Sequence, residues 1–150
     1  MKPLTIVIVD DESLARQGLR HHLNEIEGVE IIAEFGDSQQ ALNYLQTEPP
    51  DLLLVDIEMP GMTGIVLVEK LADPLPAVAF DTACDHYGIE AFRHQAIDYW
   101  LKPVDVEHLR SVVAMAATRR ERTELEQENR ALRSALYEAE QLRFGVNKVR

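Results

Sequence analysis

The stretch LTIVIVDDE, residues 4–12, places three acids directly after a run of six apolar or β-branched residues. A run of this kind is typical of a strand that is buried on both faces, as parallel strands covered by helices are. The stretch LLLVDIEMPG, residues 52–61, repeats the pattern, with Asp56 directly after the apolar residues. Acids that follow buried strands indicate an α/β domain whose polar groups gather at the carboxyl ends of its strands.

Short apolar runs alternate with segments of helical period along the chain, which is the order expected of a parallel sheet with covering helices. Between the first two runs, Leu14, Leu19 and Leu23 keep roughly helical spacing. Ser13 and Ser38 are expected to cap the helices that follow, because a hydroxyl can accept a bond from an unpaired amide of the first turn. The pattern predicts strands over residues 4–9, 29–33, 52–55, 77–80 and 97–101.

Size and composition restrict the class of protein. A chain of 150 residues with 46% hydrophobic and 27% charged residues fits one globular domain plus an appendage. Its 15 Lys and Arg against 26 Asp and Glu give a net charge of -11, which disfavours nucleic-acid binding by this segment. The lone Cys84 and an N-terminus without the apolar core of a signal peptide predict a cytoplasmic protein. No run approaches the ~20 apolar residues that cross a bilayer, so no membrane insertion is expected.

The character of the sequence changes near residue 118. Residues 1–118 hold 7 Lys or Arg and 20 Asp or Glu, or -13, whereas residues 119–150 hold 8 and 6, or +2. Leu125 and Leu132 are seven residues apart, as are Asn129 and Leu136, which fits positions d, d, a and a of one heptad frame. We therefore expect a globular domain over 1–118, a helical coiled-coil extension over 119–144, and a tail or the start of a further segment over 145–150.

The coiled-coil interpretation predicts a homodimer. Asn129 at an a position favours a parallel, in-register pair, because two facing amides bond to each other only in that alignment. The alternative is a solvated single helix, since Arg122 occupies the preceding a position and Ala139 the next d position.

Polar residues that carry chemistry follow four of the five expected strands: Asp10-Asp11-Glu12, Asp56, Thr82-Ala83 and Lys102-Pro103. The carboxyl ends of parallel strands meet at one edge of a sheet, so these groups are expected to share one crevice. Clustered carboxylates favour a hard divalent cation, and Mg²⁺, which takes one or two carboxylates, waters and phosphate oxygens, fits best. Asp56 is the expected nucleophile toward phosphorus, with the metal and Lys102 neutralising charge on the transferred oxygens.

The motifs DDE at 10–12, DIEMPG at 56–61, TA at 82–83 and KP at 102–103 resemble the receiver domain of two-component response regulators, over residues 4 to about 118. The resemblance implies a flavodoxin-like, doubly wound sheet of five parallel strands in the order 2-1-3-4-5. It also implies that a sensor histidine kinase donates a phosphoryl group to Asp56. The chain would then be a phosphoacceptor signalling protein and not an enzyme with turnover of its own.

The same resemblance implies roles for individual residues. The metal site would be formed by Asp10, Asp11, Asp56 and Glu58, the last through its backbone carbonyl and Asp10 through water. The phosphoryl oxygens would be bound by Thr82, Ala83 and Lys102. Thr82 and Tyr99 would form a switch in which the ring moves inward, although a core tyrosine is the alternative. The face of the fourth helix, fifth strand and fifth helix would change, and the fifth helix would relay the change to dimerisation or an output domain.

Several finer features accompany the resemblance. Gly61 and Gly64 match a tightly turning loop, and Pro103 matches a proline that follows a cis peptide bond. Asp81 departs from the pattern, because the residue before the switch threonine is normally apolar; an acid there would weaken phosphate binding or face water. Glu58 and Cys84 flank the path of a hydrolytic water and should influence the phosphoryl lifetime, in a direction that the sequence leaves open.

The stretches TACDHY at 82–87, IEAF at 89–92 and IDY at 97–99 resemble receivers that are attached to LytTR-type DNA-binding domains. DNA would then be bound only through an output domain outside these residues, and the function would be transcriptional. Two rivals stay open. A haloacid-dehalogenase-type phosphatase wants Asp-x-Asp after its first strand, whereas Asp10 and Asp11 are adjacent. A phosphorylation-independent, dimerising pseudo-receiver would not need the set of Asp11, Asp56, Thr82 and Lys102, which is intact here.

Overall fold

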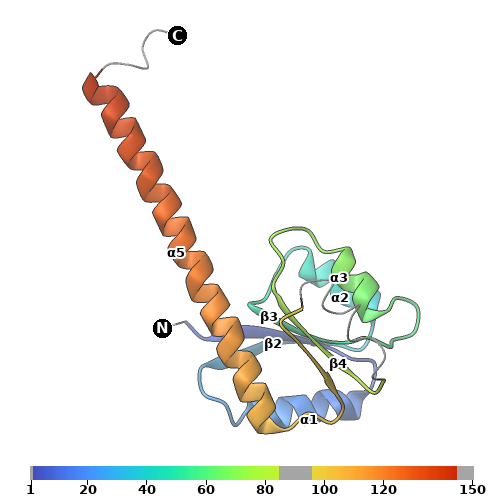
Figure 1. The fold of residues 1–150 in the computed structure, drawn as a ribbon. Coiled ribbons are helices and arrows are strands. Elements are labelled where there is room, and N and C mark those ends of the chain that lie inside the picture. The colour runs from blue at the N-terminus through green and yellow to red at the C-terminus, as the bar shows by residue number, and fades with distance from the viewer. Residues whose placement is uncertain (1, 85–95, 145–150) are drawn as a thin grey trace. The chain divides into compact units, whose positions relative to one another are not determined.

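The computed structural model describes residues 2–84 and 96–144, and a five-stranded sheet forms its centre (Figure 1). The strands lie in the order β2-β1-β3-β4-β5, and every neighbouring pair is parallel. This confirms the doubly wound, flavodoxin-like topology. The strands are β1 (Leu4–Val9), β2 (Val29–Phe35), β3 (Leu52–Asp56), β4 (Ala77–Thr82) and β5 (Asp98–Leu101).

Three strands continue further than the apolar runs suggest. The expected ends were residues 33, 55 and 80, whereas β2 continues to Phe35, β3 includes Asp56, and β4 includes Asp81 and Thr82. Asp56 pairs in register with Asp81, and Thr82 pairs with Leu101. The ladder therefore continues into the polar residues and holds their backbones, because cross-strand hydrogen bonds do not depend on the side chain.

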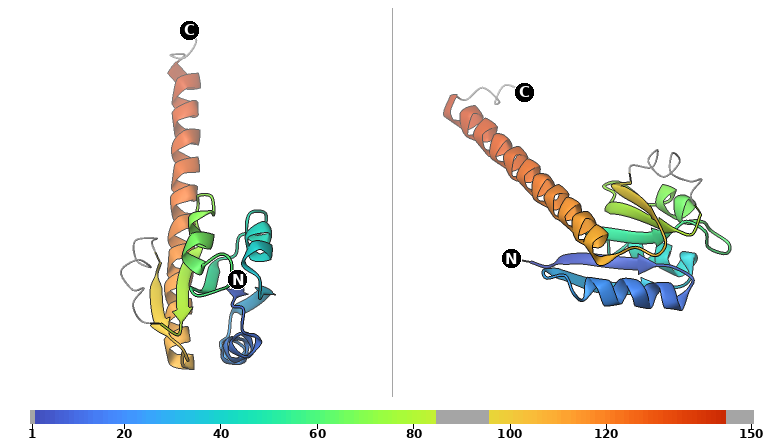
Figure 2. Two further views of the ribbon diagram at one scale, coloured as in Figure 1. Left: turned by 90° about the vertical axis from the view of Figure 1, so that its right-hand side faces the viewer. Right: turned by 60° about the horizontal axis from the view of Figure 1, so that its bottom comes forward.

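Four helices flank the sheet in the described part of the chain: α1 (Ser13–Leu23), α2 (Ser38–Leu45), α3 (Gly64–Glu69) and α5 (Val106–Phe144). Figure 2 shows α1 on one face of the sheet and α2 and α3 on the other. The expected fourth helix, with the motif residues 85–92, lies outside the described residues. No helix in the described ranges combines the length and the apolar content that a membrane crossing requires.

The expected caps at Ser13 and Ser38 are wrong. Each serine is the first residue of its helix, and the residue before it has the extended backbone of an N-cap. Asp37 caps α2, because its carboxylate accepts a hydrogen bond of 2.9 Å from the Gln40 amide. Glu12 precedes α1 without a side-chain cap. A carboxylate one residue earlier therefore does what the hydroxyl of Ser38 was expected to do.

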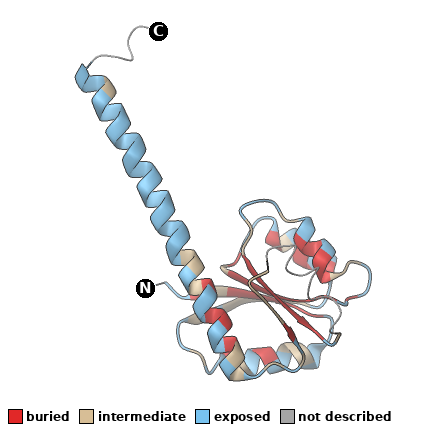
Figure 3. Cartoon of the chain, viewed as in Figure 1, coloured by how far each residue is buried: buried red, intermediate tan, exposed pale blue. Residues whose placement is uncertain are grey.

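Two layers of apolar side chains cover the sheet, as the alternation of a strand requires. In β3, Leu53 and Val55 join the layer under α2 and α3, whereas Leu52 and Leu54 join the layer under α1 and the start of α5. Burial of one such leucine contributes about 1.5–3 kcal/mol. Figure 3 shows the buried residues concentrated in the strands and on the inner faces of the helices. The start of α5 contributes Leu109, Val112, Val113 and Ala116.

The chain divides into two compact units, Met1–Ala117 and Thr118–Arg150, and α5 supplies residues to both. In the second unit, residues 121–140 are all exposed. Leu125, Leu132 and Leu136 are 56%, 59% and 65% exposed, so the heptad positions present apolar side chains to solvent.

Candidate functional site

Three acids form a row across the carboxyl edge of the sheet. Asp56 ends β3 and pairs with Asp81 of β4, and Asp10 follows Val9, whose register partner Val55 precedes Asp56. Neighbouring strands lie about 4.7–4.9 Å apart, so the row brings like charges close together. Asp10, Asp56 and Asp81 are 1%, 4% and 3% exposed. Buried carboxylates at this spacing need a positive charge nearby.

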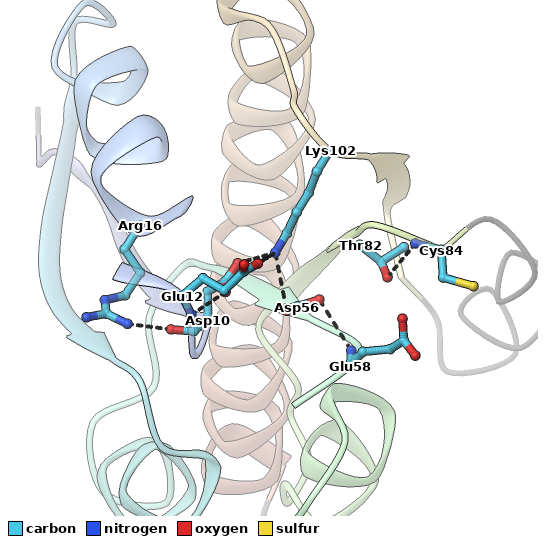
Figure 4. Close-up of polar contacts among 8 residues, drawn as sticks. All are labelled: Asp10, Glu12, Arg16, Asp56, Glu58, Thr82, Cys84 and Lys102. Carbon is cyan, nitrogen blue, oxygen red and sulfur yellow. Dashed lines mark hydrogen bonds and ion pairs between the residues drawn. The ribbon is translucent and has the colours of Figure 1, made fainter. Parts of the chain in front are cut away.

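Lys102 supplies a positive charge from the end of β5 (Figure 4). Its Nζ lies 2.8 Å from Asp10 Oδ2, 3.2 Å from Glu12 Oε1 and 3.3 Å from Asp56 Oδ2. The backbone places the residue, since the Lys102 amide donates a 2.8 Å bond to the Thr82 carbonyl. Burial alone lowers the pKa of Lys102, but the hydrogen bond to Asp10 and the charges of Asp10 and Asp56 outweigh burial and raise this pKa. The ammonium therefore stays charged at every physiological pH.

The environment of Asp56 works against its ionisation. Burial raises the pKa of Asp56 to about 6, and the charge of Lys102 offsets only part of this effect, while Asp10 adds to it. The Glu58 amide donates a 3.3 Å bond to Asp56 Oδ1, and the Glu58 side chain is exposed. One ammonium is thus insufficient to neutralise the row, and a further cation would be bound favourably.

The carboxylates at the carboxyl edge of the sheet could bind a divalent metal ion. One carboxylate oxygen each from Asp10, Asp11 and Asp56 can be chosen so that all lie within 4.8 Å of one another. Asp11 is exposed and the other two are buried, so the group opens toward solvent on one side. Mg²⁺ prefers hard oxygen ligands and keeps several waters, which a half-open set of carboxylates allows.

The residues expected to bind phosphate follow β4. Thr82 is fully buried, and its Oγ1 accepts a 3.3 Å bond from the Cys84 amide (Figure 4). Ala83 between them is exposed. Tyr99 packs against the apolar layer that contains Phe80, and its hydroxyl donates a 2.8 Å bond to the Cys84 carbonyl. The ring of Tyr99 is therefore turned inward and tied to the segment that carries Thr82.

Backbone geometry around the site agrees with two further expectations. Gly61 has a φ of 81°, a conformation that glycine adopts without the strain of a side chain. The Gly64 amide donates a 2.8 Å bond to the Ile57 carbonyl, and a Cβ at Gly64 would fall on the Asp56 carbonyl oxygen. The peptide bond between Lys102 and Pro103 is cis.

Asp81 does not face water, contrary to one of the two expectations for it. Burial raises the pKa of Asp81 to about 6, and the charge of Lys102 lowers it in part. Asp81 and Lys102 line a cavity of about 150 Å³ between α1 and the β5–α5 connection, together with Leu14, Ala15, Gly18, Leu19, His22, Pro103 and Val104.

Two contacts to the edge of the site were not anticipated from the sequence. Glu12 reaches Lys102, and Arg16 Nη1 donates a 2.6 Å bond to the Asp10 carbonyl. Glu12 directly precedes α1 and Arg16 lies in its first turn, and the spacing of four residues between them was the available signal.

A family model described as the response regulator receiver domain matches residues 6–114. A response regulatory protein of Yersinia pestis is 43% identical over 107 residues, which cover 71% of this chain and 45% of that protein. The transcriptional regulatory protein BtsR of Escherichia coli is 40% identical over 113 residues, which cover 74% of this chain and 47% of BtsR. The chain thus spans about half the length of these curated relatives.

Solved structures of receiver domains share this fold. The response regulatory domain of mrkE from Klebsiella pneumoniae matches with a TM-score of 0.73 at 30% identity, over 79% of this chain and 99% of that one. The REC domain of AraT from Geobacillus stearothermophilus matches with a TM-score of 0.70 at 36% identity, over 81% and 98%. With the sheet order, the acids of β1 and β3 and the lysine after β5 in place, the chain belongs to the response regulator receiver domains, a family of signalling proteins.

Proposed function

We propose that this chain is a phosphorylation-dependent switch in which Asp56 accepts a phosphoryl group from a sensor histidine kinase. The observation that carries the proposal is the convergence of Asp56, Asp10 and Lys102, whose Nζ lies within 3.3 Å of both carboxylates. An Asp56 oxygen would form a bond to phosphorus while the phosphorus–nitrogen bond of the kinase phosphohistidine breaks. The electron pair of that bond would stay on the imidazole nitrogen.

Residues around Asp56 suit this transfer. Asp10, Asp11, Asp56 and the Glu58 carbonyl would hold Mg²⁺, which would neutralise charge on the phosphoryl oxygens. Lys102 would move its contacts from the carboxylates to a phosphoryl oxygen. The Thr82 hydroxyl would donate a hydrogen bond to a second phosphoryl oxygen, since a hydroxyl that accepts one hydrogen bond can still donate another. The exposed Ala83 would offer its backbone amide to the third.

The switch would act on the segment that Tyr99 contacts. If Thr82 moves toward the phosphoryl group, the 2.8 Å bond from Tyr99 to the Cys84 carbonyl has to adjust, because Cys84 is bonded to Thr82 as well. The phosphoryl group would shift the equilibrium between the two positions of Thr82 only as far as it interacts more favourably with one of them than with the other. We expect β5 and α5 to carry the change to the coiled coil.

The output is proposed from the relatives and from the exposed heptad residues. The tail of α5 would form a homodimer, and a LytTR-type output domain outside this chain would bind DNA. BtsR is named a transcriptional regulatory protein, and this chain matches 47% of it, which leaves room for such a domain in the relatives. The exchange with the kinase would take place in the cytoplasm.

A mass measurement tests the proposal. The wild-type chain with Mg²⁺ and acetyl phosphate should gain one phosphoryl group, and the Asp56→Asn variant should gain none. Asp73→Asn serves as the matched control, because it removes the same charge from an exposed loop residue and should still be phosphorylated. An unmodified wild-type chain would favour the pseudo-receiver scaffold. Steady turnover of p-nitrophenyl phosphate would favour the phosphatase.

A further inference from the structure

The third acid of the row has no evident role in stabilising the fold. Asp81 is 3% exposed, and its Oδ1 has no hydrogen-bond partner among the described residues. Its neighbour in register, Trp100, is 5% exposed, and a side-chain hydrogen bond from its indole offsets part of the effect of burial on the pKa of Asp81. The layer on this face is otherwise apolar, with Leu54 and Ala79 preceding the row. A buried carboxylate that forms no ion pair with a described residue is destabilising, so an apolar residue would fit this position better.

The charge of Asp81 acts on the acceptor site. Asp81 interacts electrostatically with Lys102, Asp10 and Glu12. Asp56 is its register partner on β3, and the side chains of register partners in a parallel sheet point to the same face. His22 lines the same cavity from α1. These groups are charged or titratable neighbours of Asp81.

The local positive charge is already shared. Lys102 forms ion pairs with Asp10, Glu12 and Asp56 but none with Asp81. No ion pair with a described residue therefore neutralises the charge of Asp81. In a buried environment this charge acts on Asp56, on the neighbouring strand, with little screening. A cation placed at Asp10 and Asp56 would be attracted by it, and an anion attached to Asp56 would be repelled.

We propose that Asp81 is a tuning carboxylate of the acceptor site, which strengthens the binding of a divalent cation at Asp10, Asp11 and Asp56 and shortens the lifetime of a phosphoryl group on Asp56. The second half rests on the proposed phosphoacceptor function. Asp81 does not touch the reacting atoms, so it is a positioning residue that acts through charge. The charge of Asp81 would favour the bound cation and disfavour the bound phosphoryl group. A purely structural role would instead support both, so the two roles can be told apart.

The test uses the full chain with Asp81→Asn, which removes the charge at nearly constant shape, and Asp81→Val, which replaces the carboxylate by an apolar side chain. All measurements are made at pH 8, where Asp81 is ionised. Mg²⁺ affinity is read from the fluorescence of Trp100, the single tryptophan of the chain, and by titration calorimetry. The phosphoryl lifetime is measured at saturating Mg²⁺ after the donor has been removed, so that it does not depend on metal affinity.

Both variants should bind Mg²⁺ about tenfold more weakly and lose the phosphoryl group about tenfold more slowly, since one unit of charge is removed a few ångströms away. Asp73→Asn, which removes the same charge from an exposed loop, should match the wild type in both. If the variants bound Mg²⁺ more weakly and also lost the phosphoryl group faster, Asp81 would have a structural role. If Mg²⁺ affinity and phosphoryl lifetime both changed by less than twofold, the charge would be irrelevant. Either result overturns the proposal.

The two parts of the proposal fail separately. If the wild-type chain takes no phosphoryl group, the phosphoacceptor function is wrong, whereas the Mg²⁺ titration still tests the charge of Asp81. If the wild type is phosphorylated and the variants behave like it, the phosphoacceptor function stands and the role of Asp81 is rejected. Asp81→Val removes a buried acid whose burial is unfavourable and should fold at least as stably as the wild type, which keeps the test possible if Asp81→Asn fails to fold.

Discussion

At the scale of single residues, Gly64 links the loop after Asp56 to the strand that carries it. A Cβ at this position would fall on the backbone carbonyl oxygen of Asp56 and crowd the Cα of Ile57. Backbone atoms cannot rotate away as the end of a flexible side chain can. Gly64→Ala should therefore shift the acceptor strand and lower the free energy of unfolding by about 2 kcal/mol or more. Chemical denaturation measures the change.

Gly18 provides the matched control for this prediction. It lies within α1, is exposed, and a Cβ there would meet no atom within 4 Å. Gly18→Ala should raise the free energy of unfolding by about 0.5–1 kcal/mol, because alanine loses less backbone entropy in a helix. Equal effects of the two substitutions would contradict the close approach at Gly64.

At the scale of elements, α5 carries two different patterns on one continuous helix. Its first turns contribute Leu109 and Val112 to the apolar layer of the first unit. Its later turns expose Leu125, Leu132 and Leu136. Isolated apolar side chains on a surface are common, whereas a stripe at heptad spacing is typical of a helix that pairs with another helix.

The dimer prediction is tested at the heptad positions. Leu132→Glu places a charge at a d position and should weaken dimerisation by on the order of a hundredfold, about 3 kcal/mol, because a buried leucine pair is lost. Ser134→Glu adds the same charge at the outer f position and should leave the dimer unchanged. Sedimentation equilibrium measures both, and a wild-type chain that stays monomeric would instead support the solvated single helix.

Orientation is a separate prediction on the same element. In a chain with Cys84→Ser, the Leu125→Cys variant should cross-link to itself on oxidation if the helices are parallel and in register, because the two 125 positions then face each other. An antiparallel pair would separate these positions along the helix axis. A cross-link only between Leu125→Cys and Leu136→Cys chains would show that the Asn129 argument for a parallel pair is wrong.

At the scale of the whole molecule, the acidic row makes stability depend on pH and on metal. Burial raises the pKa of Asp56 and of Asp81 to about 6, above the value of about 3.9 in an unfolded chain. The folded state therefore binds protons more tightly than the unfolded state. The resulting penalty is absent below pH 4, grows as the pH rises through this window, and is complete above about pH 6.

Asp56→Asn should consequently raise the free energy of unfolding by about 1–2 kcal/mol at pH 8, and the gain should disappear at pH 4. Mg²⁺ should stabilise the wild type at pH 8, because it binds the folded state, and should stabilise Asp56→Asn much less. Thermal melts followed by circular dichroism measure these differences, with Asp73→Asn as the charge control. A gain that is the same at both pH values would contradict the assignment to Asp56.

The sequence predicted much of the fold because its evidence is local. Continuous apolar runs mark strands that are buried on both faces, and the positions of residues 10–12, 56, 82 and 102 at strand ends follow from the chain order of a parallel sheet. The caps were wrong because Ser13 and Ser38 were chosen by residue type, whereas the cap is decided by which residue still has an extended backbone. The roles of the site residues and the dimer stay predictions.

By itself, the sequence determined the class of sheet and the edge at which the acids meet, since both depend on patterns within a few turns of chain. Only the tertiary structure decided that Asp81 is buried and stands in register with Asp56. It also decided that, among the described residues, Lys102 forms ion pairs with Asp10, Glu12 and Asp56 and none with Asp81. The reason is physical: desolvation and ion pairing depend on neighbours brought together by strand register, across separations in sequence that no local pattern spans.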